Sequence, residues 1–280
     1  MCELFALSSQ LPTRVTFSLE EFSRHGASTG KLADGWGLAF YDGWDAQVFR
    51  EPKPAASSDW MRFILGHAYC SHRVMSHIRN ATVGSVALCN TQPFSRVLGQ
   101  RRHVFCHNGD LKGIQSRIKL DQFLPIGETD SEYGFCRLMD RLGPLWQGEA
   151  PTLDERINVV SEVLLELSRL GPANILYSDS EFLYAFAHQR TQVNGRIEAP
   201  GLYYQERHCD CDPDALQDSG VQIHDMAQDL VLLASVPLSE EGWHACAASQ
   251  LIVVKHGKIV AMRNLQQSGG VMQHLANAPQ

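Results

Sequence analysis

The chain opens with Met1-Cys2-Glu3-Leu4-Phe5-Ala6-Leu7, and residues 2–8 form a short apolar run that predicts a buried strand. Cys2 directly follows the initiator methionine, so removal of Met1 would leave one residue with both a thiol and a free α-amine. An α-amino group has a pKa of about 7.7–8.0, so near neutrality much of it is unprotonated. It can then accept the thiol proton and activate a nucleophile. The alternative is that Cys2 is a small buried apolar residue, as free cysteines often are.

The composition is that of an ordinary globular protein. The 280 residues are 44% apolar and 20% charged, which allows a sizeable core and argues against global disorder. A net charge of −7 argues against the basic surface that nucleic-acid binding requires. No apolar stretch reaches the length of a membrane span. The opening lacks the positively charged start of a signal peptide. Eight cysteines in such a chain therefore predict reduced thiols in a cytoplasmic protein.

Turn and capping signals organise the first half of the chain. Asp42-Gly43 separates two short strand-like segments and predicts a hairpin. Ser57-Ser58-Asp59 predicts the cap of a helix that runs to about Leu65. Thr129 and Glu132 have the spacing of a capping box and predict a helix that reaches Leu142. The strands expected in this half cover residues 2–8, 38–41, 46–50, 74–79 and 104–106.

The second half begins with the clearest helical pattern and continues with strands. Apolar residues over 152–170 recur at helical spacing, and Gly171-Pro172 stops the helix. Residues 206–220 are polar and irregular and predict a loop, and the tail after Leu265 is expected to fray. Strands, then helices, then strands predict an α+β protein in which helices cover sheets. The later strands are expected over residues 173–177, 182–187, 230–234, 251–254 and 258–261.

Four segments of the first half supply groups that cleavage of an amide requires. Arg79 ends a predicted strand, where a guanidinium can hold a carboxylate by two parallel hydrogen bonds. Asn90-Thr91-Gln92-Pro93-Phe94 is a polar turn stiffened by its proline. In His107-Asn108-Gly109, the asparagine side-chain N–H and the glycine backbone N–H can form an oxyanion hole. Asp130 stands at a helix start, where its carboxylate can accept hydrogen bonds from a substrate ammonium.

These motifs, taken in order, resemble a known family. Cys2, His-x-Arg-x-x-Thr at 77–82, Asn-x-Gln-Pro-Phe at 90–94, His-Asn-Gly at 107–109 and Asp-Ser-Glu at 130–132 are similar to the motifs of class II glutamine amidotransferases. These enzymes are N-terminal-nucleophile hydrolases. The Met-Cys-Glu-Leu opening and the Asp-Gly-Trp-Gly segment at 34–37 narrow the resemblance to the stand-alone bacterial branch, and it covers roughly residues 1–260.

The resemblance implies a fold and a nucleophile. The fold would be α+β, a four-layer αββα sandwich. Cys2 would attack the side-chain amide of glutamine and form a thioester, while Asn108 and Gly109 stabilise the tetrahedral oxyanion. Residues 1–265 are expected to form a single domain of this type, and residues 266–280 a frayed tail. Neither a cofactor nor a metal is implied.

The resemblance also assigns the head group of the substrate. Arg79 would grip the α-carboxylate, with Thr82 beside it, and Asp130 would bind the α-ammonium. Two positions depart from the family pattern. His25 stands where many members have an arginine before a glycine, and Val83 stands where related enzymes often have a histidine. These departures affect the support of the nucleophile and the fit of the pocket, but they remove no catalytic group.

Other features have plainer interpretations. His208-Cys209-Asp210-Cys211-Asp212 contains several metal-ligating side chains, but the Cys-x-Cys spacing lacks a second pair, which favours a solvent-facing loop over a zinc site. Cys106 beside His107 suggests a dyad, yet neighbouring side chains on a strand point to opposite faces, which favours a core position for Cys106. Residues 34–37 fit either turn packing or a lining of the site.

The leading hypothesis is a cytoplasmic glutaminase that releases ammonia from L-glutamine. The chain is expected to lack a synthase domain, so ammonia would pass to a separate ammonia-accepting synthase or be released. One alternative is a hydrolase of another γ-glutamyl amide or peptide, held by the same Arg79 and Asp130. A second alternative is a catalytically silent subunit that senses glutamine. Neither nucleic acid nor a membrane is expected as a partner.

Overall fold

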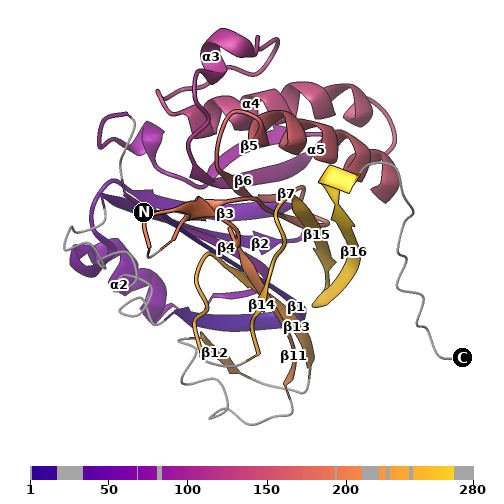
Figure 1. Ribbon diagram of the computed structural model, residues 1–280. Helices are drawn as coiled ribbons and strands as arrows, with labels where there is room; N and C mark the ends of the chain where they lie inside the picture. The colour runs from indigo at the N-terminus through magenta and orange to yellow at the C-terminus, as the bar shows by residue number, and fades with distance from the viewer. Residues whose placement is uncertain are drawn as a thin grey trace, which may run out of the picture.

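The chain folds as two antiparallel sheets stacked face to face, with helices on both outer faces (Figure 1). Helix α2 (Asp59–Gly66) covers one sheet, and α4 (Asp130–Leu142) and α5 (Leu153–Ser168) cover the other. The predicted α+β class and four-layer sandwich are therefore confirmed. The structure is a computed structural model that describes residues 2–17, 34–67, 69–80, 84–192, 194–209, 221–224, 228–239 and 242–267.

The first sheet has the N-terminal strand at its centre. Strand β1 pairs with β13 on one side and with β4 on the other, and β12 pairs with the far end of β1. The order of the strands is β14-β11-β13-β1-β4-β2-β3. Their bounds are β1 Glu3–Phe17, β2 Gly35–Asp42, β3 Asp45–Glu51, β4 Cys70–Arg79, β11 Tyr203–Cys209, β12 Val221–His224, β13 Gln228–Ala234 and β14 His244–Ala245.

The second sheet has the order β16-β15-β8-β7-β6-β5. Its central strands β7 and β8 are buried along their whole length. The bounds are β5 Phe94–Leu98, β6 Arg101–Gly109, β7 Ala173–Ser178, β8 Leu183–Ala187, β15 Gln250–Lys255 and β16 Lys258–Asn264. Outside both sheets lie a small β9–β10 pair (Arg190–Thr191 and Ile197–Glu198), helix α3 (Ile114–Arg117), and short 3₁₀ turns at Ala55–Ser57, Leu88–Asn90, Gly143–Trp146 and Leu265–Gln267.

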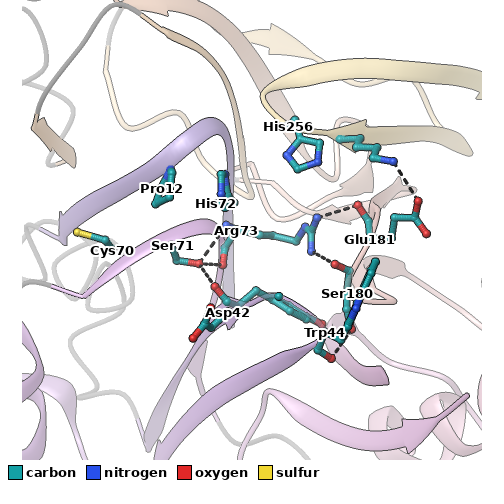
Figure 2. Close-up of a pocket in the computed structure, with 13 residues that line it drawn as sticks. Pro12, Asp42, Trp44, Cys70, Ser71, His72, Arg73, Ser180, Glu181 and His256 are labelled. Atoms are coloured by element: carbon teal, nitrogen blue, oxygen red, sulfur yellow. Dashed lines mark hydrogen bonds and ion pairs between the residues drawn. The ribbon is translucent and has the colours of Figure 1, made fainter. Parts of the chain in front are cut away.

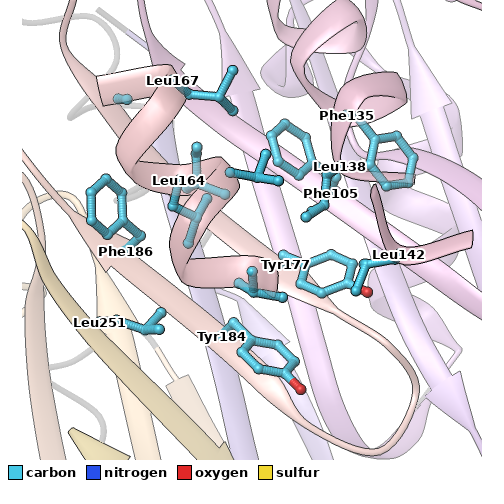
Figure 3. Close-up of a cluster of buried hydrophobic side chains, with 14 of the residues drawn as sticks. Phe105, Phe135, Leu138, Leu142, Leu164, Leu167, Tyr177, Tyr184, Phe186 and Leu251 are labelled. Atoms are coloured by element: carbon cyan, nitrogen blue, oxygen red, sulfur yellow. The ribbon is translucent and has the colours of Figure 1, made fainter. Parts of the chain in front are cut away.

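Three hydrophobic clusters hold the four layers together, because each interface between layers has its own. Small and aliphatic residues such as Ala6, Cys106 and Leu176 fill the space between the sheets. Larger side chains pack α4 and α5 onto the second sheet, where Phe105 stacks on Phe135 with 5.1 Å between ring centroids (Figure 3). A third cluster places α2 against the outer face of the first sheet. Cys106 is fully buried, which agrees with its expected core position.

The elements differ from the sequence prediction in two ways: some extend further, and several strands were not expected, namely β9, β10, β11, β12 and β14. The opening strand runs to Phe17 instead of residue 8, and β5 was not expected. The loop predicted over residues 206–220 is wrong at its start, because β11 continues to Cys209; residues 210–220 lie outside the described part. Of the described tail, Leu265–Gln267 forms a 3₁₀ turn.

Helix α4 starts at the expected place but lacks a full capping box. Thr129 accepts a hydrogen bond from the backbone of Glu132, at 3.2 Å. The Glu132 carboxylate does not return to Thr129. It accepts from the backbone N–H of Gly127 at 2.7 Å and from Arg96 at 2.6 Å. The half-buried guanidinium of Arg96 is the stronger partner because it is charged, so the Glu132 side chain ties the helix to β5. The complete capping box is at Thr152, before α5.

Candidate active site

Cys2 lies at one end of the sandwich, where β1 begins beside the end of β4. The register pairs Glu3 with Ile78, which brings Cys2 against Asn80. The backbone N–H of Asn80 donates to the sulfur at 3.3 Å, and the thiol donates to the Asn80 carbonyl at 3.4 Å. Burial raises the pKa of the Cys2 thiol; the backbone N–H of Asn80 and the charge of Arg79 oppose the rise, and Asp130 adds to it. Both charged side chains therefore lie within electrostatic reach of the sulfur.

Arg79 is the last residue of β4 and is only 4% exposed. Its backbone is fixed from the β2 side, because it pairs with Gly35 and its carbonyl accepts from the backbone N–H of Asp34 at 2.8 Å. Its guanidinium donates to the carbonyl of Gly84 at 3.3 Å. Gly84 has φ of +76°, a conformation that glycine adopts without strain. The cation is thus held beside the nucleophile by regular strand pairing and one tight turn.

Asn108 and Gly109 end β6 in the second sheet and face Cys2 across the interface between the sheets. The Asn108 side-chain amide donates to the backbone carbonyl of Cys2 at 2.6 Å. Gly109 could not be another residue, because a Cβ atom there would lie 1.8 Å from the carbonyl oxygen of Pro172. This close approach keeps the end of β6 against β7. The two candidate oxyanion donors are therefore adjacent to the thiol residue.

Asp130 is the first residue of α4, and its carboxylate is already engaged. One oxygen accepts from the backbone N–H of Leu111 at 2.7 Å, and the Ser131 hydroxyl lies 3.5 Å from the other. Its negative charge acts on two neighbouring groups: it raises the pKa of the half-buried Cys2 thiol, and it opposes the lowering that burial imposes on the pKa of His107. Cys2, Arg79, Asn108 and Asp130 thus come from four different elements and meet at one end of the sandwich.

Two sequence calls lie outside the part of the chain that the structure describes. They are Thr82, expected beside the substrate carboxylate, and the departures from the family pattern at His25 and Val83. In the proposed metal loop, Asp210–Asp212 also lie outside it. Within it, His208 bonds to Asp229 at 2.7 Å, and no described group of three ligating side chains could hold a metal.

Gln92 has a role that the sequence did not indicate. Its side-chain amide donates to the His107 carbonyl at 3.1 Å and accepts from the His107 backbone N–H at 2.5 Å. A two-pronged bond of this kind replaces a missing strand neighbour and fixes the backbone next to Asn108. Gly37 backs onto the same segment, since a Cβ atom there would lie 2.1 Å from the Gln92 carbonyl. The Asp-Gly-Trp-Gly segment at 34–37 therefore packs against the Asn-Thr-Gln-Pro turn.

Two histidines and a second asparagine complete the support behind the site. His107 is buried and its Nδ1 lies 2.8 Å from the Ser131 hydroxyl. His77 is fully buried, and burial lowers its pKa to about 3. Asn174 pairs with Asn108 between β6 and β7 and donates to its carbonyl at 3.2 Å. A pairing between distant strands leaves no signal in the local sequence, so these contacts were not predicted.

Comparisons with known proteins show the family to which the chain belongs. A family model described as "Glutamine amidotransferases class-II" matches residues 1–277. YafJ of Escherichia coli (strain K12), whose name marks it as a candidate glutamine amidotransferase, is 36% identical over 186 residues, which are 66% of this chain and 72% of YafJ. The uncharacterized protein MJ1515 of Methanocaldococcus jannaschii is 30% identical over 265 residues, covering 93% of this chain and 71% of that protein.

Solved structures support the same grouping. The crystal structure of a predicted glutamine amidotransferase from Pseudomonas aeruginosa PA01 superposes with a TM-score of 0.66 and 28% identity, over 93% of this chain and 100% of that one. The glutamine phosphoribosylpyrophosphate amidotransferase from B. subtilis shares the fold, with a TM-score of 0.59 and 12% identity over 95% of this chain and 50% of its own. The chain belongs to the class II glutamine amidotransferase family.

Among its described helices, none is long and apolar enough to span a membrane.

Proposed function

We propose that this protein hydrolyses the side-chain amide of glutamine with Cys2 as its nucleophile. The observation that carries the proposal is the meeting of Cys2, Arg79, Asn108 and Asp130 at one end of the sandwich, from four separate elements. A thiol, an anion-binding guanidinium, amide donors and a carboxylate are the groups that recognition and cleavage of a zwitterionic amide require. Membership of the family supports the same reaction.

The nucleophile needs a base, because burial raises the pKa of its thiol. Among the described residues, neither buried histidine is suited to this task. His107 lies against Ser131, and burial lowers its pKa and that of His77. The remaining base is the α-amine of Cys2 itself, which becomes free once Met1 is removed. The proposed catalyst is therefore the processed chain.

In the proposed reaction, Cys2 supplies both the nucleophile, its thiol, and the base, its α-amine. The α-amine takes the thiol proton, and the sulfur adds to the amide carbonyl carbon. Asn108 and the backbone N–H of Gly109 stabilise the oxyanion, for which Asn108 exchanges its present partner, the Cys2 carbonyl. The C–N bond breaks, and ammonia leaves with the proton from the amine. Water, deprotonated by the same amine, releases glutamate from the thioester and restores the thiol.

The head group of glutamine is assigned to the two charged residues. Arg79 would bind the α-carboxylate, with Thr82 nearby, and Asp130 would bind the α-ammonium. The Leu111 N–H bond to Asp130 occupies one of its oxygens, which orients the carboxylate and leaves further acceptor positions. The ammonia would go to a separate synthase that accepts it, or to solvent.

Labelling with a glutamine-like diazoketone tests the nucleophile. We expect covalent modification of Cys2 alone, together with loss of ammonia release, and neither in Cys2→Ala. Intact-protein mass on the same sample shows whether Met1 is absent from the molecules that react. Cys106→Ala is the matched control, because that thiol is buried in the core and burial raises its pKa far above the usual range. Labelling of Cys106, or activity in Cys2→Ala, contradicts the proposal. Inactive protein that retains Met1 in cells favours a glutamine-sensing subunit.

A larger γ-glutamyl amide is a second candidate substrate. Two loops near the site carry exposed apolar side chains, Val86 and Leu88 on one loop and Leu124 and Ile126 on the other. Glu128 joins the loops, since its carboxylate accepts from the backbone N–H of Ser85 at 3.3 Å. Ammonia needs no apolar contact, whereas an amine with a hydrophobic part does. Faster turnover of γ-glutamyl dipeptides than of glutamine identifies this activity.

A further inference from the structure

A cavity of about 390 Å³ lies at the other end of the sandwich from Cys2. Strand β4 connects the two ends: Cys70 to Arg73 line the cavity, whereas Arg79 lies at the candidate active site. Its ten residues span about 30 Å at 3.4 Å per residue. The cavity is enclosed by the β2–β3, β7–β8 and β15–β16 turns (Figure 2). Its volume falls within the range of small-molecule sites.

A buried arginine forms one wall of this cavity. Arg73 is 4% exposed, and its two terminal nitrogens donate to the carbonyls of Ser180 and Glu181, at 2.7 and 2.8 Å. Its guanidinium lies 5.0 Å from the ring centroid of Tyr41. Its Nε–H has no hydrogen-bond partner among the described residues. The charge of Arg73 is therefore met by backbone dipoles and an aromatic ring, and by no directly bonded carboxylate.

The neighbouring carboxylates are already bound to other cations. Glu181 contacts Arg101, Arg156 and Lys255, and Asp179 contacts Arg156. Although burial alone would raise the pKa of Glu181, its bonds to Lys255 and Arg156 lower it to about 2, so it is fully ionised. Asp42 adds one exposed carboxylate at the rim. In the network around the cavity, four cations (Arg73, Arg101, Arg156 and Lys255) outnumber three carboxylates by one charge, whereas among the lining residues alone Arg73 and Lys255 are balanced by Asp42 and Glu181.

Two histidines add hydrogen-bond donors to the same wall. His72 and His256 make an edge-to-face contact, with 5.6 Å between ring centroids. Burial lowers the pKa of His256; His72, Lys255 and Arg73 lower it further, whereas Glu181 opposes this. His256 has φ of +47° in the two-residue turn between β15 and β16, a position where asparagine or glycine is favoured. The conformation of the turn does not require a histidine, so we attribute the presence of His256 to a role of its imidazole in the cavity.

We propose that this cavity binds a small organic anion, a carboxylate or a phosphate ester. Its anionic oxygens would lie against Lys255 and the His72–His256 pair, with the charge of Arg73 behind them. The excess positive charge of the surrounding network and the N–H groups of the two histidines favour an anion over a neutral ligand, because charge-assisted hydrogen bonds are stronger than neutral ones. The site does not depend on the proposed glutaminase activity, and the bound anion would not compete with glutamine.

Calorimetric titration with inorganic phosphate and with citrate, at constant ionic strength, tests the site. Wild type should bind at least one of them with one-to-one stoichiometry. Lys255→Met and His256→Asn should each weaken that binding at least tenfold, and asparagine is compatible with the turn. Lys258→Met is the matched control, because Lys258 is in the same turn but its ammonium contacts Asp229, at 3.3 Å, outside the cavity. Tighter binding of phosphate identifies a phosphate ester as the natural ligand, and tighter binding of citrate identifies a carboxylate.

The imidazole NMR signals of His72 and His256 locate the binding independently. Both should shift along the titration in wild type, and the His256 signal is assigned by its absence in His256→Asn. No saturable binding of either anion at millimolar concentration overturns the proposal. Equal weakening by Lys258→Met also overturns it, because the effect would then be general surface charge.

Discussion

The charges around Cys2 act on its sulfur in opposite directions. Arg79 favours the thiolate, whereas burial and Asp130 favour the thiol, and the balance is a pKa above the usual value. The thiol of Cys2, the proposed nucleophile, is thus protonated at neutral pH. Its activity therefore depends on the pKa of the base that takes the proton, and not on the thiol alone.

Asn108 provides the clearest test at the residue scale. Removing its side chain would take away one of the two proposed oxyanion donors, whose interaction with the substrate would strengthen only in the transition state. We expect Asn108→Ala to lower kcat by roughly 10²–10³ with a smaller change in KM, measured by ammonia release. A change in KM alone would show that Asn108 contacts the ground state, and the oxyanion donors would have to be sought elsewhere.

The two ends of the substrate can be separated with a matched pair of variants. Arg79→Lys keeps the positive charge but loses the two-pronged geometry, so it should weaken glutamine by on the order of 1–3 kcal/mol. Asp130→Asn should impair glutamine but spare N-acetylglutamine, which has no ammonium to bind. Steady-state kinetics with glutamine, glutamine amide and N-acetylglutamine measure both effects. If wild type accepts all three equally, neither residue binds the head group.

Glu3 makes stability depend on pH. Burial raises its pKa to about 7, and the charge of Arg190 only partly opposes this. A raised carboxyl pKa gives a contribution to folding that is complete below about 4.5 and is lost as the pH rises through about 7. At pH 8, the free energy of unfolding of Glu3→Gln, measured by denaturant titration, should therefore exceed that of wild type by on the order of 2–3 kcal/mol. At pH 4.5 the two proteins should differ little. An equal difference at both pH values would refute the assignment to Glu3.

At the scale of elements, one glycine sets the distance between β2 and the turn that holds Gln92. Gly37→Ala would place a methyl group 2.1 Å from the Gln92 carbonyl, so the turn must move. We expect a loss of about 1–3 kcal/mol in stability and a fall in kcat through displacement of His107 and Asn108. Chemical denaturation and ammonia release measure the two effects. Gly66→Ala is the control, since a Cβ atom there meets no heavy atom within 4 Å; a similar loss in that variant would mean that the contact is irrelevant.

Elements whose signals are local were predictable from the sequence. The Asp42-Gly43 turn and the Ser58 cap depend on residues within a few positions, and each occurs where it was expected. Helix α5 was likewise expected from its own apolar spacing. Strands β5 and β12 were missed because their pairing partners, not their own composition, decide them.

The candidate site divides in the same way. Cys2, Arg79, Asn108 and Asp130 could be named from motifs, and the structure brings them together. The clamp of Gln92 on His107 and the support from Asn174 could not be named, because both depend on strands that meet only in the fold.

At the scale of the whole molecule, buried neutral histidines make the folded state less stable in acid. Burial lowers the pKa of His77 to about 3 and that of His103 to about 4, so both favour folding above about 6.5, and this contribution is lost as the pH falls. We expect the denaturant concentration at the midpoint of unfolding to decrease as the pH is lowered from 6.5 to 4. Substitution His103→Asn should flatten this decrease, as followed by near-ultraviolet circular dichroism. An unchanged pH profile in this variant would remove His103 from the explanation.

The central place of β1 in its sheet has a consequence for the order of events during synthesis. The N-terminal strand is made first, but its neighbour β13 ends at Ala234, so the strand cannot be enclosed until most of the chain exists. At roughly 5–20 residues per second, the interval lasts on the order of ten seconds or more. During that interval the beginning of the chain stays accessible to the aminopeptidase that removes methionine. A first strand at the centre of its sheet would thus leave time for Met1 to be removed before Cys2, the proposed nucleophile, is enclosed.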